Sequence, residues 1–218
     1  MKIHIDLLDK KRQKIFTKLS VFSKYGYLAG GTALSLQIGH RISYDFDIFC
    51  PHEISHSLKL AVKKHLAVKK ILINTTDELT FLTKADVKVS FIYYPFKIKH
   101  NLMSNAKTPI KLLSIKGIAA SKAYTLGRRG KWRDYLDLYF ILKNKYIELP
   151  AIIKQAKNIY KNFFNEKLFL SQLLYTDDIS DSDIQEANLL KEKVNVSRVK
   201  KFFSQQIKEY VNLPQNYF

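Results

Sequence analysis

The sequence predicts a mixed α/β fold in its first half and an all-helical region behind it. Up to Pro95, stretches with the period-2 alternation of strands are interleaved with stretches of helical period, and after Pro95 the helical period takes over. The 218 residues, 46% of them hydrophobic, suit one domain of ordinary size or two small domains packed together. We therefore expect an α/β domain with a small mixed sheet flanked by helices over residues 1–105, followed by a C-terminal helical bundle over residues 106–218.

Elements up to residue 95 follow from hydrophobic spacing and from the residues that bound them. Thr32 stands before an apolar run at helical spacing, which suits a helix with the threonine near its N-cap and its end at Gly39. The stretch YDFDIFC before Pro51 alternates polar and apolar side chains, and VKVSFIYY from Val87 is the strongest strand pattern because it is rich in β-branched and aromatic residues. In chain order we expect a basic amphipathic helix over 10–24, a strand over 27–29, a helix from Thr32, a strand over 44–50, a helix over 53–68, and strands over 69–74, 79–84 and from 87.

Elements after residue 95 are predicted to be helices. The chain contains no internal repeat and no low-complexity linker, so the change of pattern between residues 96 and 111 is not expected to be a flexible joint. The predicted amphipathic helices cover residues 111–126, 132–144, 151–174, 183–194 and 197–211.

Charge is distributed unevenly along the chain. The 37 basic and 19 acidic residues leave a formal charge of +18, and residues 1–145 hold 27 of the basic and 10 of the acidic ones. A field of this sign attracts polyanions such as nucleic acid, and its contribution weakens with salt. A genome rich in lysine codons is the alternative explanation of the same charge.

Several classes of protein are disfavoured by composition. No apolar run reaches the roughly 18 to 20 residues of a membrane span, and the N-terminal stretch MKIHIDLLDKKRQ lacks the apolar core of a signal peptide. Cys50 is the one cysteine, which rules out an internal disulfide and a multi-cysteine zinc site. We therefore expect a cytoplasmic protein with no membrane partner.

A double glycine and a pair of aspartates are the chain's main candidate site. Strand alternation places Asp45 and Asp47 on one face, and two such carboxylates are tolerated together when a divalent cation such as Mg²⁺ binds between them. Gly30 and Gly31 let backbone N–H groups approach an anion at the start of the next helix. The pattern is consistent with a nucleoside triphosphate site, and equally with a glycine turn followed by an edge strand with solvated aspartates.

With these two motifs, the sequence resembles the nucleotidyltransferases of polymerase-β-like fold. Their hallmark is a Gly-Gly or Gly-Ser pair, a spacer of about ten residues and Asp-x-Asp on a strand; here thirteen residues separate Gly30-Gly31 from Asp45-Phe46-Asp47. The string GGTALSLQIGHRISYDFDIF is more specifically similar to the AbiEii/AbiGii-type toxins of bacterial abortive-infection and type IV toxin-antitoxin systems. The similarity continues at SKAYTLGRRGKWRDYLDLYFIL, residues 121–142.

The resemblance implies a nucleotidyltransferase core, a reaction and a set of site residues. A hydroxyl would attack the α-phosphate of a nucleoside triphosphate, and pyrophosphate would leave. Asp45 and Asp47 would bind Mg²⁺ or Mn²⁺, and residues 111–144 would complete the cleft. The residues expected to bind the nucleotide are Gly30, Gly31, Thr32, Arg41, Ser43, Arg129 and Arg133, and those expected to be catalytic are Asp45, Asp47, Lys122, Asp134 and Asp137.

The second motif, in residues 121–142, can also be interpreted from its residues alone. Asp134 and Asp137 lie one helical turn apart and therefore on one face, which suits either a site or a solvated acidic pair. The assignment of Lys122 to phosphate rests on the resemblance alone. Ser90 stands where many members of the wider superfamily have a third carboxylate beside Asp-x-Asp, so Asp134 becomes the hypothesised general base.

A competing motif is His52-Glu53-Ile54-Ser55-His56, which has the H-E-x-x-H form of zinc hydrolases. Two histidines four apart on a helix can share a metal, and Glu78 is a conceivable third ligand. Exposed residues in the first turn of a surface helix are the simpler explanation.

Two classes of function remain open. The first is an enzyme that transfers a nucleotide to an acceptor, with RNA and in particular the tRNA 3′ end as the expected acceptor and an antitoxin as a possible partner. The second is a catalytically silent protein of the same fold that binds nucleic acid or an antitoxin. Aromatic residues placed among basic ones could stack on RNA bases or pack in the core; they are Tyr93, Tyr94, Phe96, Tyr124 and Trp132.

Overall fold

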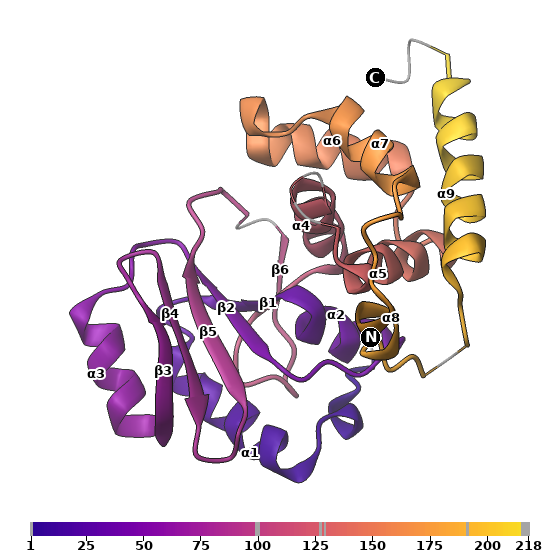
Figure 1. Cartoon of the computed structure of the whole chain (residues 1–218). Coiled ribbons are helices and arrows are strands. Elements are labelled where there is room, and N and C mark those ends of the chain that lie inside the picture. The colour runs from indigo at the N-terminus through magenta and orange to yellow at the C-terminus, as the bar shows by residue number, and fades with distance from the viewer. Residues whose placement is uncertain (1, 99–100, 127, 129, 191, 215–218) are drawn as a thin grey trace. The chain divides into compact units, whose positions relative to one another are not determined.

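The structure of the protein is a computed structural model that describes residues 2–98, 101–126, 128, 130–190 and 192–214. The chain divides into two compact units, Met1–Ser114 and Ile115–Phe218 (Figure 1). The first unit contains the sheet and the second contains the later helices, so the mixed α/β class expected from the sequence is confirmed.

The first unit is built on a seven-stranded mixed sheet in the order β3-β4-β5-β2-β1-β7-β6. The neighbours β2 and β5 are parallel, as are β1 and β7, whereas the other adjacent pairs are antiparallel. The strands are β1 (Tyr27–Ala29), β2 (Phe46–Cys50), β3 (Val68–Asn74), β4 (Glu78–Thr83), β5 (Lys88–Tyr93), β6 (Leu102–Met103) and β7 (Leu112–Leu113).

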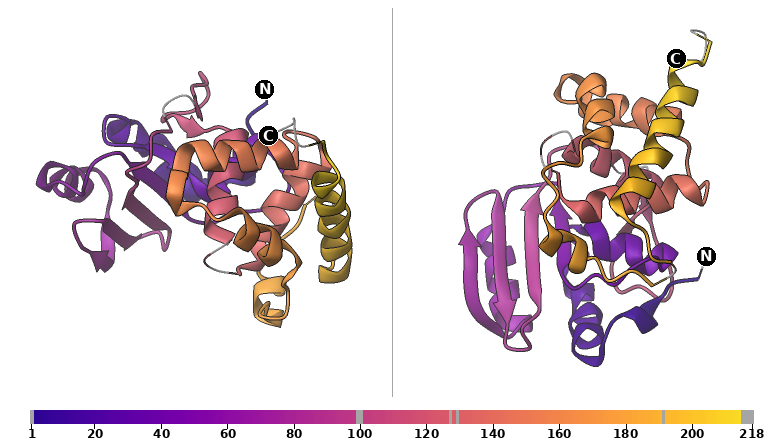
Figure 2. Two further views of the ribbon diagram at one scale, coloured as in Figure 1. Left: turned by 90° about the horizontal axis from the view of Figure 1, so that it is seen from above. Right: turned by 45° about the vertical axis from the view of Figure 1, so that its right-hand side comes forward.

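Helices α1 and α3 cover one face of this sheet (Figures 1 and 2). The ring of Phe16 stacks on Phe46 of β2 with centroids 6.1 Å apart, and Phe22 meets Phe91 of β5 at 5.1 Å. This apolar layer is the core of the first unit. The helices of this unit are η1 (Ile5–Leu7), α1 (Lys10–Lys18), η2 (Leu19–Phe22), α2 (Gly30–Ile38) and α3 (His56–His65).

The second unit is helical and packs around α5. Its fully buried side chains include Trp132, Tyr135 and Phe140 of α5, with Tyr160 of α6 and Phe203 of α9. The helices are α4 (Ile115–Leu126), α5 (Trp132–Lys143), α6 (Leu149–Tyr160), η4 (Lys161–Phe163), α7 (Glu166–Leu174), α8 (Asp181–Gln185) and α9 (Val196–Val211). Among the described residues, no helix is both long and apolar enough to cross a membrane.

Several predicted boundaries are wrong, and the structure gives a reason for each. The helix expected over 151–174 is interrupted because Lys161 takes a positive φ of 51° and Asn165 caps a new helix. The helix expected over 183–194 ends at Gln185, and Asn188 also has a positive φ, of 42°. The start of the helix expected over 111–126 is instead strand β7, held to β1 by the pairing of Leu112 with Leu28.

Candidate functional site

The glycine pair joins β1 directly to α2. The helix begins at Gly30, whose φ of +66° lies in the left-handed region that glycine tolerates best. A Cβ on Gly30 would stand 2.7 Å from Oδ2 of Asp47, so the backbone passes the carboxylate more closely than any side chain allows. The first glycine thus brings the start of α2 against the aspartate strand.

Gly31 makes a second close approach, to the loop that follows α2. A Cβ at this position would collide with the guanidinium of Arg41 and lie 3.1 Å from Oγ of Ser43. Ala29 occupies the N-cap, and no side chain in the described part of the chain caps the helix. The first backbone N–H groups of α2 therefore have the arrangement that binds phosphate at helix N-termini, with a buried cation beside them.

Thr32 is the third residue of α2, so the helix begins two residues before the start that was expected at Thr32. Its buried hydroxyl donates to the backbone carbonyl of Asp45 and lies 2.9 Å from Oγ of Ser43. The hydroxyl of Ser35, one turn later, donates to the carbonyl of Arg41. These hydrogen bonds fix the loop of residues 41–45 against the helix, so the side chain of Thr32 orders the loop.

The two aspartates lie on one face at the start of β2. Asp45 immediately precedes the strand and Asp47 is its second residue, and both are half-buried, whereas Phe46 and Ile48 between and beyond them are fully buried. Their carboxylates therefore share the face opposite the apolar core, as strand alternation predicts. Lys88 of β5 forms an ion pair with Asp45 at 2.8 Å, a contact that the sequence did not predict.

Ser90 stands beside Asp47 in the paired strands β2 and β5. On its other side it pairs with Thr80 of β4, whose hydroxyl lies 2.9 Å from Oγ of Ser90 and 2.6 Å from Oε1 of Glu78. Strand β5 thus has a serine where a third carboxylate was expected. The neighbouring strand β4 carries the carboxylate of Glu78, which the hydroxyl groups of Thr80 and Ser90 connect to this position. From the sequence, Glu78 was expected only as a possible zinc ligand.

In the second unit, Lys122 of α4 is held between two carboxylates of α5. Its ammonium group contacts Asp134 and lies 2.8 Å from Oδ2 of Asp137. All three residues are buried, with 8% of Lys122, 2% of Asp134 and none of Asp137 exposed. A buried ion triad of this kind is costly to disrupt, so it fixes the packing of α4 against α5.

The predicted site residues therefore form two groups, one in each unit. The loop and strand residues Gly30, Gly31, Thr32, Arg41, Ser43, Asp45 and Asp47 come together in the first unit. Lys122, Asp134 and Asp137 come together in the second. Arg133 is half-buried in the first turn of α5, and Arg129 lies outside the described residues.

The prediction of a zinc site at His52 and His56 is wrong, because the structure lacks the helical geometry that it requires. Helix α3 begins at His56 because Ser55 caps it by accepting from the N–H of Leu58, so His52 and Glu53 precede the helix and are exposed. His52 and His56 are therefore not one turn apart on a helical face. Within the described ranges, no three His, Cys, Asp or Glu residues gather as a metal cluster.

Comparisons with known proteins found a relative in sequence and a solved structure of similar fold. An uncharacterized protein of Aquifex aeolicus (strain VF5) is 31% identical over 188 residues, which cover 85% of this chain and 87% of that protein. The crystal structure of a candidate nucleotidyltransferase from H. pylori superposes with a TM-score of 0.59 at 19% identity, covering 95% of this chain and all of that one, which shows a shared fold. A Megavirus polyadenylate synthase reaches a TM-score of only 0.46 over 65% of this chain and 32% of its own, at 14% identity, too low to support a conclusion.

Residues 17–209 match the family described as nucleotidyl transferase AbiEii toxin, type IV TA system. The match includes the glycine pair, Asp45 and Asp47, and the buried lysine–aspartate triad. The chain belongs to the AbiEii nucleotidyltransferase family.

Proposed function

We propose that the protein transfers a nucleoside monophosphate from a nucleoside triphosphate to a hydroxyl of RNA, with the 3′ end of tRNA as the acceptor. One observation carries the proposal: the N-terminus of α2 is held against Asp47, with Arg41 beside Gly31. A phosphate bound by the helix amides would lie next to a carboxylate pair able to hold its metal.

The donor set of the first unit fits Mg²⁺ or Mn²⁺. Mg²⁺ binds through one or two carboxylates together with substrate phosphate oxygens, and Asp45 and Asp47 are two carboxylates on one strand face. When bound there, the metal would supply neutralisation of the charge on the phosphates. Arg41, whose guanidinium is buried beside Gly31, would attract the same phosphates.

The transfer requires one bond to form and one to break. The acceptor hydroxyl oxygen bonds to the α-phosphorus, the bond to the leaving pyrophosphate breaks, and the hydroxyl proton passes to a base. We assign the base to Asp134 and phosphate neutralisation to Lys122, with Asp137 positioning the lysine. Arg129 and Arg133 are proposed as further nucleotide-binding residues from the resemblance.

RNA as the acceptor is supported by charge. A formal charge of +18 over 218 residues favours a polyanionic substrate, and binding of such a substrate weakens with salt. Membership of a type IV toxin-antitoxin family supports a toxic role in cells and an antitoxin as partner. Expression should then arrest growth, and Asp47→Ala should relieve the arrest.

A second function is supported by a specific observation. The β5 position beside Asp47 carries Ser90, and Asp45 is paired with Lys88, an arrangement that a catalytically silent nucleic-acid-binding relative would also show. Such a protein would bind RNA without incorporating a nucleotide.

One experiment separates the two. The purified protein is incubated with each α-labelled nucleoside triphosphate, total tRNA and Mg²⁺, and label in the RNA is counted. We expect Mg²⁺-dependent incorporation that Asp47→Ala abolishes and Asp86→Ala, a change at an exposed aspartate of the same unit, leaves intact. Binding of tRNA without incorporation from any of the four nucleotides would instead establish the silent protein.

A further inference from the structure

The aromatic residues that neighbour lysines and arginines in the sequence differ in their surroundings. Trp132 is 1% exposed and belongs to the core of the second unit. Tyr124 is stacked on Tyr160, with centroids 4.1 Å apart, and Arg128 lies over its ring at 3.7 Å. Trp132 is buried, and Tyr124 is covered by both a ring and a guanidinium group, so neither is a platform for a base. Tyr94 and Phe96, in contrast, line a cavity.

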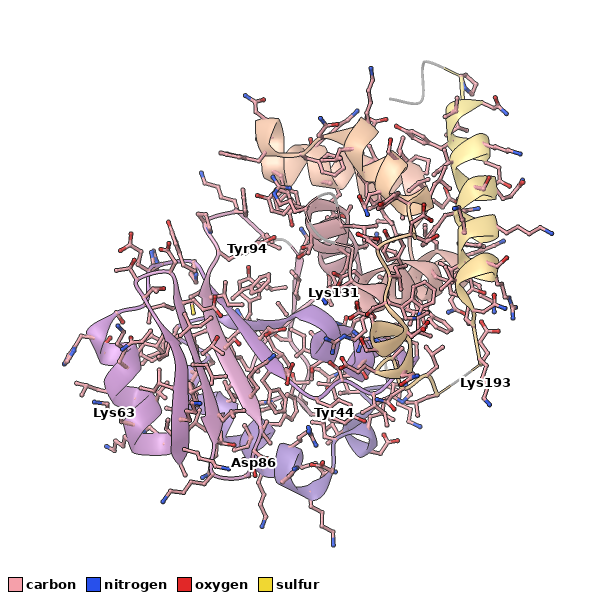
Figure 3. All side chains as sticks on the ribbon, in the orientation of Figure 1. Tyr44, Lys63, Asp86, Tyr94, Lys131 and Lys193 are labelled. Carbon is pink, nitrogen blue, oxygen red and sulfur yellow. The ribbon has the colours of Figure 1, made fainter. Side chains whose placement is uncertain are left out.

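This cavity, which we call the aromatic cleft, has a volume of about 580 Å³ and lies entirely within the first unit. Four rings line it, those of Tyr25, Tyr27, Tyr94 and Phe96. It is formed where β2 and β5 end and β1 begins. Figure 3 shows Asp86 and Tyr94 at opposite ends of β5, so the cleft lies at the strand ends remote from Asp45.

The aromatic cleft is held in shape by packing and by backbone hydrogen bonds. The ring of Tyr94 stacks on Phe49 of β2 at 4.2 Å, and Phe96 meets Tyr94 edge-on at 5.1 Å. The backbone N–H of Tyr94 donates to the carbonyl of Cys50 at 2.7 Å, and that of Leu28 donates to the carbonyl of Lys111 at 2.9 Å. These contacts indicate a largely preformed site, as binding pockets generally are.

The charged side chains that line the aromatic cleft are all positive. Lys24, Lys97 and Lys111 line it and are exposed, and none of the described residues lining it is acidic. The ammonium of Lys24 lies 5.0 Å from the ring centroid of Tyr25, so cation and ring face the same region. Aromatic rings with lysines around them are the combination by which proteins hold single-stranded nucleic acid.

We propose that the aromatic cleft binds single-stranded RNA, with bases stacked on Tyr94 and Phe96 and phosphates held by the three lysines. A site for one particular mononucleotide needs buried polar groups that converge on its base, whereas the charged side chains of this cleft are exposed lysines. Stacking accepts any base because every base has a π-face, which suits a strand.

Strand β2 connects the aromatic cleft to the aspartates. Phe49, on which Tyr94 stacks, is two residues after Asp47 and therefore on the same face, about 7 Å along the strand. A strand bound in the cleft can continue over this face toward Asp47. Its role as the docking site of the acceptor rests on the proposed nucleotide transfer, whereas RNA binding itself does not.

The test is a binding measurement without metal or nucleotide. A fluorescein-labelled single-stranded RNA of twelve mixed-sequence nucleotides is titrated with protein in EDTA, and anisotropy is followed between 50 and 200 mM salt. Tyr94→Leu should weaken binding by about 5- to 150-fold, the range for one lost stack on a base, and Tyr94→Phe should retain it. Thermal melting verifies that each variant is folded, and Tyr146→Leu, at an exposed tyrosine of the second unit, is the matched control.

Charge is tested separately, on a surface position that folding does not require. Lys97→Ala should weaken binding and reduce the slope of log affinity against log salt by about 0.7, the share of one phosphate contact in a single strand. Lys63→Ala, which removes an exposed lysine from α3, should leave the slope unchanged.

Two results would overturn the proposal. The first is that both Tyr94→Leu and Lys97→Ala bind the RNA with wild-type affinity. The second is that free AMP competes with the labelled RNA as effectively, mole for mole, as unlabelled RNA does, because that result would identify a mononucleotide site. Asp47→Ala should bind the RNA like the wild type while losing transfer, so failure of the proposed catalysis and failure of the cleft are distinguishable.

Discussion

The ammonium of Lys122 lies 2.8 Å from Oδ2 of Asp137, a residue with no exposed surface. Asp134 contacts the same ammonium group, so one cation pairs with two buried carboxylates on adjacent turns of α5. Removal of the cation would leave two negative charges close together in the interior of the second unit. We therefore expect the interaction to stabilise the fold whatever its part in catalysis.

Lys122→Met should lower the free energy of unfolding by about 3–5 kcal/mol, the usual cost of removing one partner from a buried ion pair. Urea unfolding followed by circular dichroism measures the change. Lys116→Met is the matched control, because Lys116 is exposed on the same helix, and it should be nearly neutral. Equal stability of the two variants would show that the triad contributes little to the fold.

Asp134→Asn tests the proposed general base with a smaller structural change. The amide keeps the size of the side chain, and Asp137 still neutralises Lys122, so the protein should stay folded. Nucleotide transfer should fall by about 10²- to 10⁴-fold, the usual contribution of general-base catalysis. Transfer at the wild-type rate would refute the role of Asp134.

Gly30→Ala should abolish most transfer and also cost stability. Alanine at a φ of +66° is strained by about 1–2 kcal/mol, and its Cβ would displace the carboxylate of Asp47. Gly39→Ala is a matched control, because Gly39 ends the same helix at a φ of +60° and its Cβ would meet the ring of His4 instead. If the two variants melt at similar temperatures and only Gly30→Ala loses transfer, displacement of Asp47 explains the loss. If both variants lose transfer equally, backbone strain explains it.

Lys88 and a divalent cation are expected to compete for Asp45. The ion pair is partly exposed, and such pairs contribute at most about 1 kcal/mol. Lys88→Met should therefore lower the Mg²⁺ concentration for half-maximal transfer by up to about fivefold. A Mg²⁺ titration of the transfer rate measures this shift; a rise in that concentration would mean that Lys88 assists the site.

Local patterns predicted the elements that position the first group of site residues. Strand β1, the end of α2 at Gly39 and the strand carrying Asp47 were all expected, because alternation and glycine boundaries are encoded within a few residues. The two-residue strand β7 was missed because its pairing with β1, through Leu112 and Leu28, is a contact between distant parts of the chain. A strand of two residues is too short to show a period of alternating polar and apolar side chains.

The site contacts that the sequence did not predict depend on strand register. Lys88 reaches Asp45, and Thr80 joins Ser90 to Glu78, only because β2, β5 and β4 are aligned as neighbours. The shared face of Asp134 and Asp137 could be derived from helical spacing. Their pairing with Lys122 was not predicted, because the family resemblance indicated Lys122 only as a residue that neutralises phosphate. Spacing within one element is local information, and the choice of a partner on another element is not.

Cys50, at the end of β2, should make stability depend on pH in the alkaline range. Burial raises the pKa of its thiol to about 12, so the folded protein keeps the proton while the unfolded chain loses it above about pH 9. The stabilising contribution is complete below pH 9 and is lost as pH rises toward 12, by roughly 1 kcal/mol for each pH unit. Urea unfolding at pH 8, 9 and 10 should show a steeper decline for the wild type than for Cys50→Ala, which has no thiol to ionise. Parallel declines would mean that the thiol ionises equally in both states, and rapid alkylation of the native protein by iodoacetamide at pH 8 would contradict its burial directly.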